Sequence, residues 1–141
     1  RRYIDARHAD GGMADMSALD YSLMVEESII ETKITEYRIK PAEEALTSDP
    51  KNWPLAAAAL SDHLSDGISM VYSFYEPTED KRGLGTFMIL ETIQYAKSLG
   101  LPYVYLGYWI DGSRKMGYKT RFGPQEHLGQ NGWERSKLTP K

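Results

Sequence analysis

The chain has 141 residues, a formal net charge of −3 and no cysteine. Its length predicts one domain over residues 1–141, and its 41% apolar and 26% charged residues exclude collagen, a coiled coil and wholesale disorder. Without cysteine it holds no disulfide, zinc–thiolate site, iron–sulfur cluster or cysteine nucleophile, and its slight acidity excludes an overall basic coat but not a local basic patch.

The first predicted elements end with a short helix. Residues 1–8 are expected to be the end of a helix, and residues 9–15, which carry paired glycines between aspartates, are expected to form a loop. Ser17 is a plausible N-cap, and apolar residues at helical spacing follow it. We therefore predict a helix from Ser17 to about Glu27.

A strand and a long loop follow. Residues 28–39 alternate along the chain and include many β-branched side chains, which favours a strand. Residues 40–54 are rich in proline and in other turn-forming residues. This segment is predicted to be the longest loop, with one helical turn at 42–46.

The next segment predicts a β-hairpin. Residues 55–64 include four consecutive alanines, which favour a helix, but Pro54 and the Ser65-Asp66-Gly67 run bound a segment of strand length. Asp66-Gly67 is a strong signal for a short hairpin turn, and residues 68–75 alternate as a strand does. The alternation assigns four side chains to one face: Ile68, Met70, Tyr72 and Phe74.

Residues 84–99 form the clearest predicted helix, which follows a polar loop at 76–82. Its apolar residues occupy one half of a helical wheel. Gly100 is placed to end the helix in a left-handed conformation. The apolar half consists of Leu84, Met88, Ile89, Ile93, Ala96 and Leu99.

The last third of the chain predicts a strand followed by shorter elements. Residues 103–110 are apolar on both faces, which is typical of a central strand covered on both sides. The order strand, helix, strand predicts a right-handed crossover between two parallel strands. Asp111-Gly112 is expected to turn the chain, Ser113 to cap a short helix, residues 122–128 to form a strand and residues 129–141 a loose tail.

These elements predict an α/β (α+β) fold, with helices packed on a mixed sheet. The longest nearly apolar run, Trp53 to Leu60, is far shorter than the roughly 20 residues that cross a bilayer. A cytoplasmic protein without a membrane partner is therefore expected.

The first candidate site is the run Lys81-Arg82-Gly83-Leu84-Gly85 at the start of the long helix. Peptide N–H groups and the positive end of the helix dipole hold anions at such positions. The glycines allow a phosphate to approach closely, and Arg82 adds charge. The alternative is a helix start that needs glycine only for its turn. Met88 stands where a third glycine would be, so the run is not a dinucleotide-binding fingerprint.

The second candidate site is the basic run from Gly112 to Arg121, which carries four cations in eight positions. Lys115 and Lys119 would share one face of a helix, where like charges repel by a few tenths of a kcal/mol. A phosphate backbone or a carboxylate substrate would reverse the sign of that repulsion. The alternative is a solvated basic face without a partner.

Aromatic residues at 72–75 and 103–109 form a third candidate site. They could stack on an exposed base or line a pocket, or pack within the sheet in the ordinary way. A fourth candidate pairs His8 with Asp10, as an oriented base or as part of a surface loop. The histidine spacing is not that of a metal site, and no metal is predicted. No motif predicts a covalent nucleophile.

Several runs of the chain share an unusual composition: Arg7 to Met13, Ser73 to Tyr75, Gly83 to Phe87, Leu101 to Ile110, Gly112 to Met116 and Tyr118-Lys119. In this order they resemble the C-terminal catalytic region of the aminoacyl-tRNA–protein transferases of the N-degron pathway. They resemble in particular the bacterial aspartate/glutamate leucyltransferases. The resemblance extends over nearly the whole chain.

The resemblance implies a GNAT-like fold, in which the helix-start glycines occupy the place where acetyltransferases hold the pyrophosphate of coenzyme A. Asp80 stands where those enzymes usually have Gln or Arg, which disfavours coenzyme A. Members of the family also carry an N-terminal domain with cysteines, which is expected to be absent from this chain.

The implied reaction transfers leucine from leucyl-tRNA to the α-amine of proteins that begin with Asp or Glu. It needs no cofactor, and its partners are the acceptor end of the tRNA and the acidic N-terminus. Catalytic roles are assigned to His8, Asp10, Tyr105 and Tyr108. Substrate binding is assigned to Arg82, Gly83, Gly85, Tyr72, Arg114, Lys115, Tyr118, Lys119 and Arg121.

Two alternative functions fit the same residues. The helix-start glycines would also suit a coenzyme A-dependent N-acetyltransferase of the GNAT type. The cations would also suit a non-catalytic reader of acidic N-termini.

Overall fold

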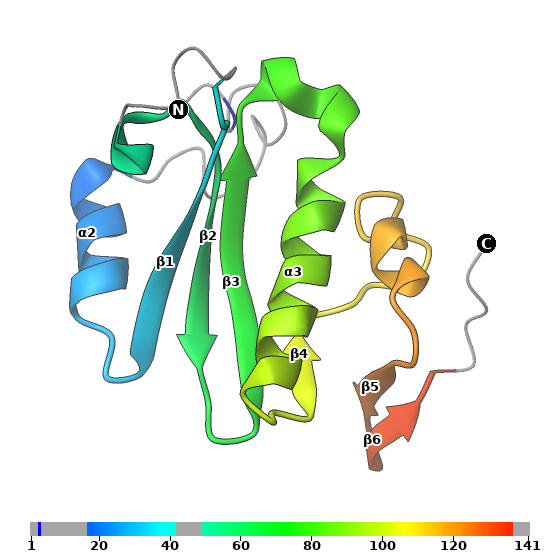
Figure 1. The fold of residues 1–141 in the computed structure, drawn as a ribbon. Coiled ribbons are helices and arrows are strands. Elements are labelled where there is room, and N and C mark those ends of the chain that lie inside the picture. The colour runs from blue at the N-terminus through cyan, green and yellow to red at the C-terminus, as the bar shows by residue number, and fades with distance from the viewer. Residues whose placement is uncertain (1–2, 4–16, 42–48, 137–141) are drawn as a thin grey trace. The chain divides into compact units, whose positions relative to one another are not determined.

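The computed structural model describes residue 3, residues 17–41 and residues 49–136. It divides into two compact units, residues 1–105 and residues 106–141. The first unit holds a four-stranded mixed sheet with helices, and the second holds a two-stranded sheet (Figure 1). The predicted mixed α/β architecture is confirmed, whereas the GNAT likeness stays a prediction. Apart from Tyr3, the predictions for residues 1–15 and for the turn at 42–46 lie outside the described residues.

The four strands of the first unit lie side by side in sequence order. The pairs β1–β2 and β2–β3 are antiparallel, and the pair β3–β4 is parallel. The predicted hairpin and the predicted parallel pair are therefore confirmed, and the four alanines belong to a strand. The strands are β1 (Glu31–Arg38), β2 (Leu55–His63), β3 (Gly67–Tyr75) and β4 (Tyr103–Tyr105).

Helix α2 (Ala18–Glu26) begins where its cap predicts. The Ser17 hydroxyl accepts a hydrogen bond from the Asp20 N–H at 3.2 Å, and the Asp20 carboxylate accepts one from the Ser17 N–H at 2.7 Å. This reciprocal capping box satisfies backbone donors that the helix itself cannot. Val25 of α2 reaches the apolar side chains on one face of the sheet.

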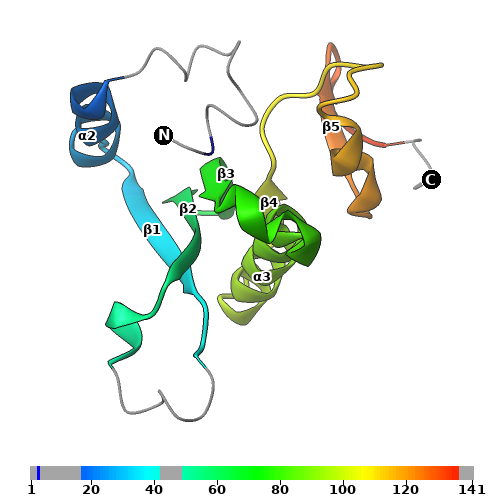
Figure 2. The same cartoon turned by 90° about the horizontal axis from the view of Figure 1, so that it is seen from above.

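Helix α3 (Leu84–Ser98) covers the opposite face of the sheet (Figures 1 and 2). Its Leu84 and Met88 pack against alanines of β2, and Met88 is fully buried. Alanine side chains are small, so the helix approaches the sheet closely there. The predicted buried face is confirmed at Leu84, Met88, Ile89 and Ala96.

Gly100 ends α3 as predicted, with φ at +72°. Its N–H donates to the Lys97 carbonyl at 3.1 Å, and the Leu101 N–H donates to the Ala96 carbonyl at 2.9 Å. This pair of hydrogen bonds is the Schellman arrangement, which a left-handed residue makes possible.

The single apolar face predicted for residues 68–75 is wrong. Leu60 pairs with Tyr72, but Ser61 pairs with Met70, so Val71 is an extra residue in β3. Such a bulge reverses the facing of every later side chain. Met70 therefore packs toward α3, whereas Tyr72 lines a hollow on the other face with Val25.

The long central strand predicted at residues 103–110 is also wrong. Strand β4 ends at Tyr105 and lies at the edge of the sheet. Its pairing with β3 is tight, because a Cβ built on Gly67 would lie 2.6 Å from the Tyr103 carbonyl oxygen. Soon afterwards, Gly107 takes a left-handed conformation with φ at +78°.

The second unit differs from the prediction at three elements. The helical segment is a 3-10 helix, Gly117–Arg121, and the Ser113 side chain does not cap it. The strand predicted at residues 122–128 is shorter and begins later, as β5 (Glu126–Gly129). The predicted loose tail contains β6 (Gly132–Arg135), which pairs with β5.

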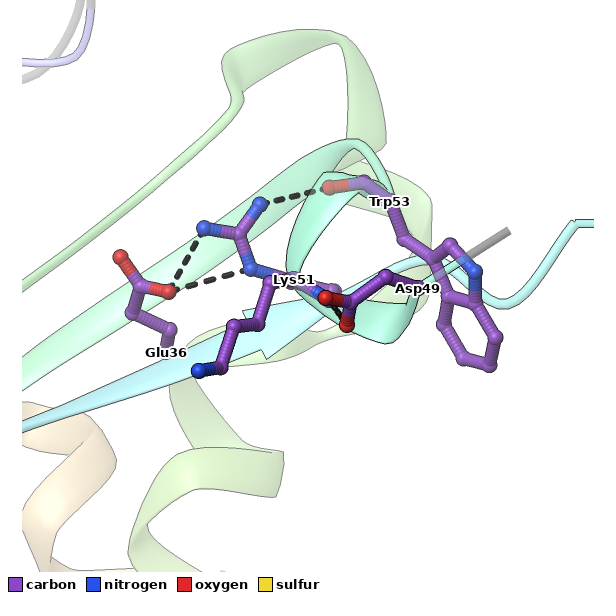
Figure 3. A network of polar contacts seen from close by, with 5 residues as sticks. Glu36, Asp49, Lys51 and Trp53 are labelled. Carbon is purple, nitrogen blue, oxygen red and sulfur yellow. Dashed lines mark hydrogen bonds and ion pairs between the residues drawn. The ribbon is translucent and has the colours of Figure 1, made fainter.

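A network of polar contacts closes the loop between β1 and β2 (Figure 3). The Arg38 guanidinium donates to the Trp53 carbonyl at 2.6 Å and, through Nε and Nη2, to one Glu36 carboxylate oxygen. The Ile39 N–H donates to the Pro54 carbonyl at 2.8 Å. Both ends of the loop are therefore fixed to the sheet. In the described part of the chain, no helix is long and apolar enough to cross a membrane.

Candidate functional site

The start of α3 is the first candidate site that the sequence predicts. A 3-10 helix, Pro77–Arg82, leads into Gly83, whose left-handed φ of +62° turns the chain into α3. The Gly83 carbonyl accepts the Phe87 N–H at 3.0 Å. Peptide N–H groups in the first turn of a helix have no acceptor within that helix, and the dipole makes this end positive. An anion placed there would therefore be stabilised.

Arg82 already binds a carboxylate at this helix start. Its Nε lies 2.7 Å from a Glu79 carboxylate oxygen, and its side chain is 55% exposed. An exposed ion pair of this kind contributes about 1 kcal/mol or less. A bound carboxylate or phosphate could therefore displace Glu79 at small cost.

A hollow of about 210 Å³ lies at the carboxyl end of β3, next to this helix start. The rings of Tyr3 and Tyr75 meet edge to face, with centroids 4.9 Å apart. A Cβ built on Gly85 would lie 3.9 Å from the Tyr75 ring, so the hollow and the start of α3 are neighbours. The walls are Tyr3, Leu55, Ala56, Ala57, Phe74, Tyr75, Glu76 and Pro77.

The chemistry of this hollow is mixed. Seven of its eight lining residues are aromatic or aliphatic, and Glu76 is the one acidic residue among them. The Glu76 N–H donates to the Ala56 carbonyl at 2.8 Å, which fixes that residue to β2. An apolar group bearing a cation or a hydrogen-bond donor would suit such a space.

Two tyrosines predicted for the site lie elsewhere in the first unit. Tyr72 lines an apolar hollow of about 70 Å³ on the sheet face opposite α3. The Tyr105 hydroxyl donates to the Asp66 carboxylate at 2.8 Å, at the hairpin turn. That turn begins β3, whereas Tyr75 ends it, and eight residues of strand span about 26 Å. The structure does not bring Tyr72 or Tyr105 to the start of α3.

The remaining described candidates belong to the second unit. Lys119 is half-buried, and its ammonium donates to the Tyr108 carbonyl at 2.9 Å. Burial lowers the pKa of Lys119 and raises the pKa of the Tyr118 phenol. The 3-10 helix begins at Gly117, so the helical face predicted for Lys115 and Lys119 is wrong. Among the described residues of this unit, four cations are exposed: Arg114, Lys115, Arg121 and Arg135.

Tyr3 and Glu76 were not among the predicted site residues, whereas Tyr75 belongs to the aromatic residues of the third candidate site. Glu76 could have been found, because it directly follows a strand, a place where residues often line ligand sites. Nothing in the sequence pairs Tyr3 with Tyr75. His8 and Asp10 lie outside the described residues, and within the described ranges no three acidic or histidine side chains gather as metal ligands.

Comparison with known proteins places these features in a family. Residues 1–129 match the family model described as "Arginine-tRNA-protein transferase, C terminus". The chain is 58% identical over 135 residues to the aspartate/glutamate leucyltransferase of Sinorhizobium medicae, which covers 96% of this chain and 52% of that protein. The protein of that name from Agrobacterium fabrum is 59% identical over 134 residues, which covers 95% of the chain and 53% of the relative.

A third relative of the same name, from a Methylobacterium species, is 58% identical over 135 residues, which covers 96% of the chain and 54% of the relative. The chain thus spans about half the length of the curated relatives that it matches. The family model covers most of the chain, and the three relatives align with nearly all of its sequence. The chain therefore belongs to the arginine-tRNA-protein transferase C-terminal family.

Proposed function

We propose that this chain carries out acyl transfer as part of an aminoacyl-tRNA–protein transferase that moves leucine from leucyl-tRNA to an N-terminal Asp or Glu. The observation that carries the proposal is its identity of 58–59%, over almost its whole length, with proteins named aspartate/glutamate leucyltransferase. Leucine added to an N-terminus would mark the protein for degradation in the N-degron pathway. The expected location of the reaction is the cytoplasm, where charged tRNA is found.

The chemistry is aminolysis of an activated ester. The lone pair of the acceptor α-amine attacks the carbonyl carbon of the leucyl ester and forms the new C–N bond. The ester C–O bond then breaks, the terminal ribose of the tRNA recovers its hydroxyl with the proton lost by the amine, and an amide remains. Because an α-amine has a pKa of about 8, much of it is neutral near pH 7.5 and no strong base is required.

Catalysis of this reaction can therefore rest on alignment of the amine with the ester and on donors near the developing oxyanion. His8, Asp10 and Tyr108 are the side chains proposed to move protons or contact the ester. Tyr105 and Tyr72 are not assigned to the ester, because Tyr105 lies at the hairpin turn and Tyr72 lies on the sheet face opposite α3. Each of these roles predicts a loss of turnover in a variant that lacks the polar group.

The acidic side chain of the acceptor requires a cation. Arg82 is the proposed partner, because it already holds the carboxylate of Glu79 at 2.7 Å, and an acceptor Asp or Glu offers the same group. The peptide N–H groups after Gly83 and Gly85 would add donors at the same place. Phosphates of the acceptor end are assigned to the exposed cations Arg114, Lys115 and Arg121, with Tyr118 and Lys119 as their neighbours in the same segment.

A coenzyme A-dependent N-acetyltransferase is the second enzyme function to test, since the glycine-bearing start of α3 would also suit a pyrophosphate. A non-catalytic reader of acidic N-termini is the third. The two differ from the proposed function in a simple way: the acetyltransferase uses acetyl-CoA and no tRNA, and the reader turns over neither.

The test uses two proteins in parallel: the 141-residue chain, and a chimera in which this chain replaces the matched half of the Sinorhizobium medicae relative. Each is mixed with radiolabelled leucyl-tRNA and peptides that begin with Asp, Glu, Lys or Ala. For the chimera, we expect label on the Asp and Glu peptides alone. The label transferred by the 141-residue chain, compared with that transferred by the chimera, measures how much the other half of the protein adds. A chimera that transfers nothing, or that uses arginyl-tRNA or acetyl-CoA instead, would refute the proposal.

A further inference from the structure

We infer that Tyr108 is a stacking platform for an unpaired base of the tRNA acceptor end, and that Lys119 is the positioning residue that holds this platform in place. The inference rests on the proposed function and names the nucleic-acid contact of that function. It concerns the second unit alone. It also gives Lys119 a different role from a direct phosphate contact.

The main chain of Lys119 is fixed at both of its polar groups. Its N–H donates to the Met116 carbonyl at 3.0 Å, and its carbonyl accepts from the Phe122 N–H at 3.3 Å. The Gln125 side-chain amide donates to the same carbonyl. The ammonium at the far end donates to the Tyr108 carbonyl at 2.9 Å. Lys119 therefore ties the segment before Asp111 to the 3-10 helix.

The Tyr108 ring is exposed although its backbone is held. Its exposed fraction is 72%, whereas the neighbouring Trp109 is half-buried and its ring lies 5.7 Å from that of His127 in β5. Trp109 anchors this stretch, so packing does not require an aromatic residue at position 108. Gly107, directly before the tyrosine, takes a left-handed conformation. The ring is presented to solvent by a fixed segment.

The surroundings of the ring favour nucleic acid. The Lys119 ammonium lies over the Tyr108 ring, 5.7 Å from its centroid, within the range of a cation–π contact. From Gly112 to Arg121 the chain carries no acidic residue and three exposed cations. Exposed aromatic rings beside cations are the usual device for binding single strands, because every base has a flat face that can stack on a ring. The acceptor end of a tRNA is such a strand.

The ammonium of Lys119 is poorly placed to act as a free phosphate ligand. It is half-buried and already donates to a carbonyl, and desolvation lowers the pKa of Lys119. Arg114, by contrast, is exposed, and it forms no ion pair with any described residue. The two cations should therefore respond differently to salt.

The first test measures binding of a fluorescent five-nucleotide RNA that ends in CCA, and of uncharged tRNA, to the full 141-residue chain. Tyr108→Ala should raise the Kd by about 5- to 100-fold, the equivalent of one stacked base, and Tyr108→Phe should restore binding because it returns the ring. Leu128→Ala, which removes another exposed side chain of the same unit, is the matched control. Equal binding by Tyr108→Ala and the parent would overturn the inference, as would a parent that binds neither RNA.

The second test separates positioning from phosphate contact through the salt dependence of binding. Lys119→Met should weaken RNA binding without changing the slope of log K against log salt, whereas Arg114→Gln should reduce that slope by about 0.7 for a single strand. Lys119→Arg, which keeps a charged donor, should recover binding. A slope reduced by Lys119→Met to the same extent as by Arg114→Gln would make Lys119 a phosphate ligand and overturn its positioning role.

These measurements also distinguish failure of this inference from failure of the proposed function. If the chimera transfers leucine and Tyr108→Ala leaves its KM for leucyl-tRNA unchanged, the function stands and the inference is overturned. If the chimera transfers nothing but Tyr108→Ala still weakens RNA binding, the inference stands without the function. An Asp-initiated peptide that binds the parent but not Tyr108→Ala would overturn the inference in favour of a protein contact.

Discussion

The most direct test of the fold replaces Gly67 by alanine. The glycine is buried, and a Cβ built on it would lie 2.6 Å from the Tyr103 carbonyl oxygen and 2.9 Å from a Tyr105 ring carbon. Carbon atoms essentially never approach a carbonyl oxygen so closely. Since that oxygen belongs to backbone, β4 must move away from β3, and only three residue pairs join these two strands.

The magnitude follows from two opposing terms. Overpacking of a well-packed site costs about 1–3 kcal/mol. Alanine restricts the unfolded chain and returns about 0.4–1 kcal/mol. We therefore expect Gly67→Ala to lower the free energy of unfolding by about 1–2 kcal/mol. With an m-value of about 2 kcal/mol/M, the urea midpoint measured by far-UV circular dichroism should fall by about 0.5–1 M.

Gly85→Ala is the matched control for this variant. Its new Cβ would meet only the Tyr75 ring, at an ordinary contact distance of 3.9 Å, and alanine in a helix is favoured over glycine by about 0.8–1.0 kcal/mol. Its urea midpoint should rise. A Gly67→Ala protein as stable as the parent, or more stable, would refute the close contact between β3 and β4.

Three further predictions follow from single contacts. Tyr105→Phe removes the hydrogen bond to Asp66 and should cost about 0.5–1.5 kcal/mol; a lower cost in Asp66→Asn, which keeps an acceptor, is the comparison. Met88→Ala empties a fully buried position and should cost about 2–5 kcal/mol in urea unfolding; a loss below 1 kcal/mol would contradict its place in the core. Burial raises the pKa of Tyr37, and its hydrogen bond to Glu91 raises it further. Its contribution to stability is therefore full below pH 10 and declines progressively as pH rises from 10 toward the raised pKa of the folded state. Parent and Tyr37→Phe should converge in stability over that range, and a constant difference would disprove this.

The elements with strong local signals could be predicted from the sequence. The Ser17 cap, the hairpin turn before β3 and the glycine at position 100 each act through a few neighbouring residues, so α2, the hairpin and the end of α3 follow from short-range chemistry. The turn itself lies one residue earlier than predicted, at Ser65-Asp66, and Gly67 is the first residue of β3. The buried face of α3 follows from the spacing of its apolar residues. None of these requires knowledge of a distant partner.

The predictions that are wrong concern positions where contacts between residues far apart in the sequence determine the structure. The bulge at Val71 depends on the register with β2, which alternation within β3 does not reveal. The strand predicted through Ile110 has suitable side chains along its length, but its pairing ends at Tyr105. Strand β6 is different, because Asn131-Gly132 is a hairpin signal that the sequence does carry. It could have been predicted.

The candidate site shows the same difference between what local sequence reveals and what only the folded structure reveals. Composition finds the cations, but it does not show that Arg82 is paired with Glu79 or that Lys119 is held by a carbonyl. The first contact would have to be exchanged for a ligand, and the second holds a backbone segment in place. Neither can be read from the sequence, which gives the charges but not their partners.

The hydrogen bonds that hold both ends of the loop between β1 and β2 make this protein convenient to label. Arg38 and the Ile39–Pro54 hydrogen bond hold the two ends of the loop independently of what lies between them. Lengthening a loop whose ends are already held costs little, about 0.6 kcal/mol for each doubling. An affinity tag or a single cysteine for a fluorophore, inserted among residues 42–48, should therefore leave the sheet intact. In a chain without cysteine, that thiol would be the sole attachment point for a dye or a surface tether.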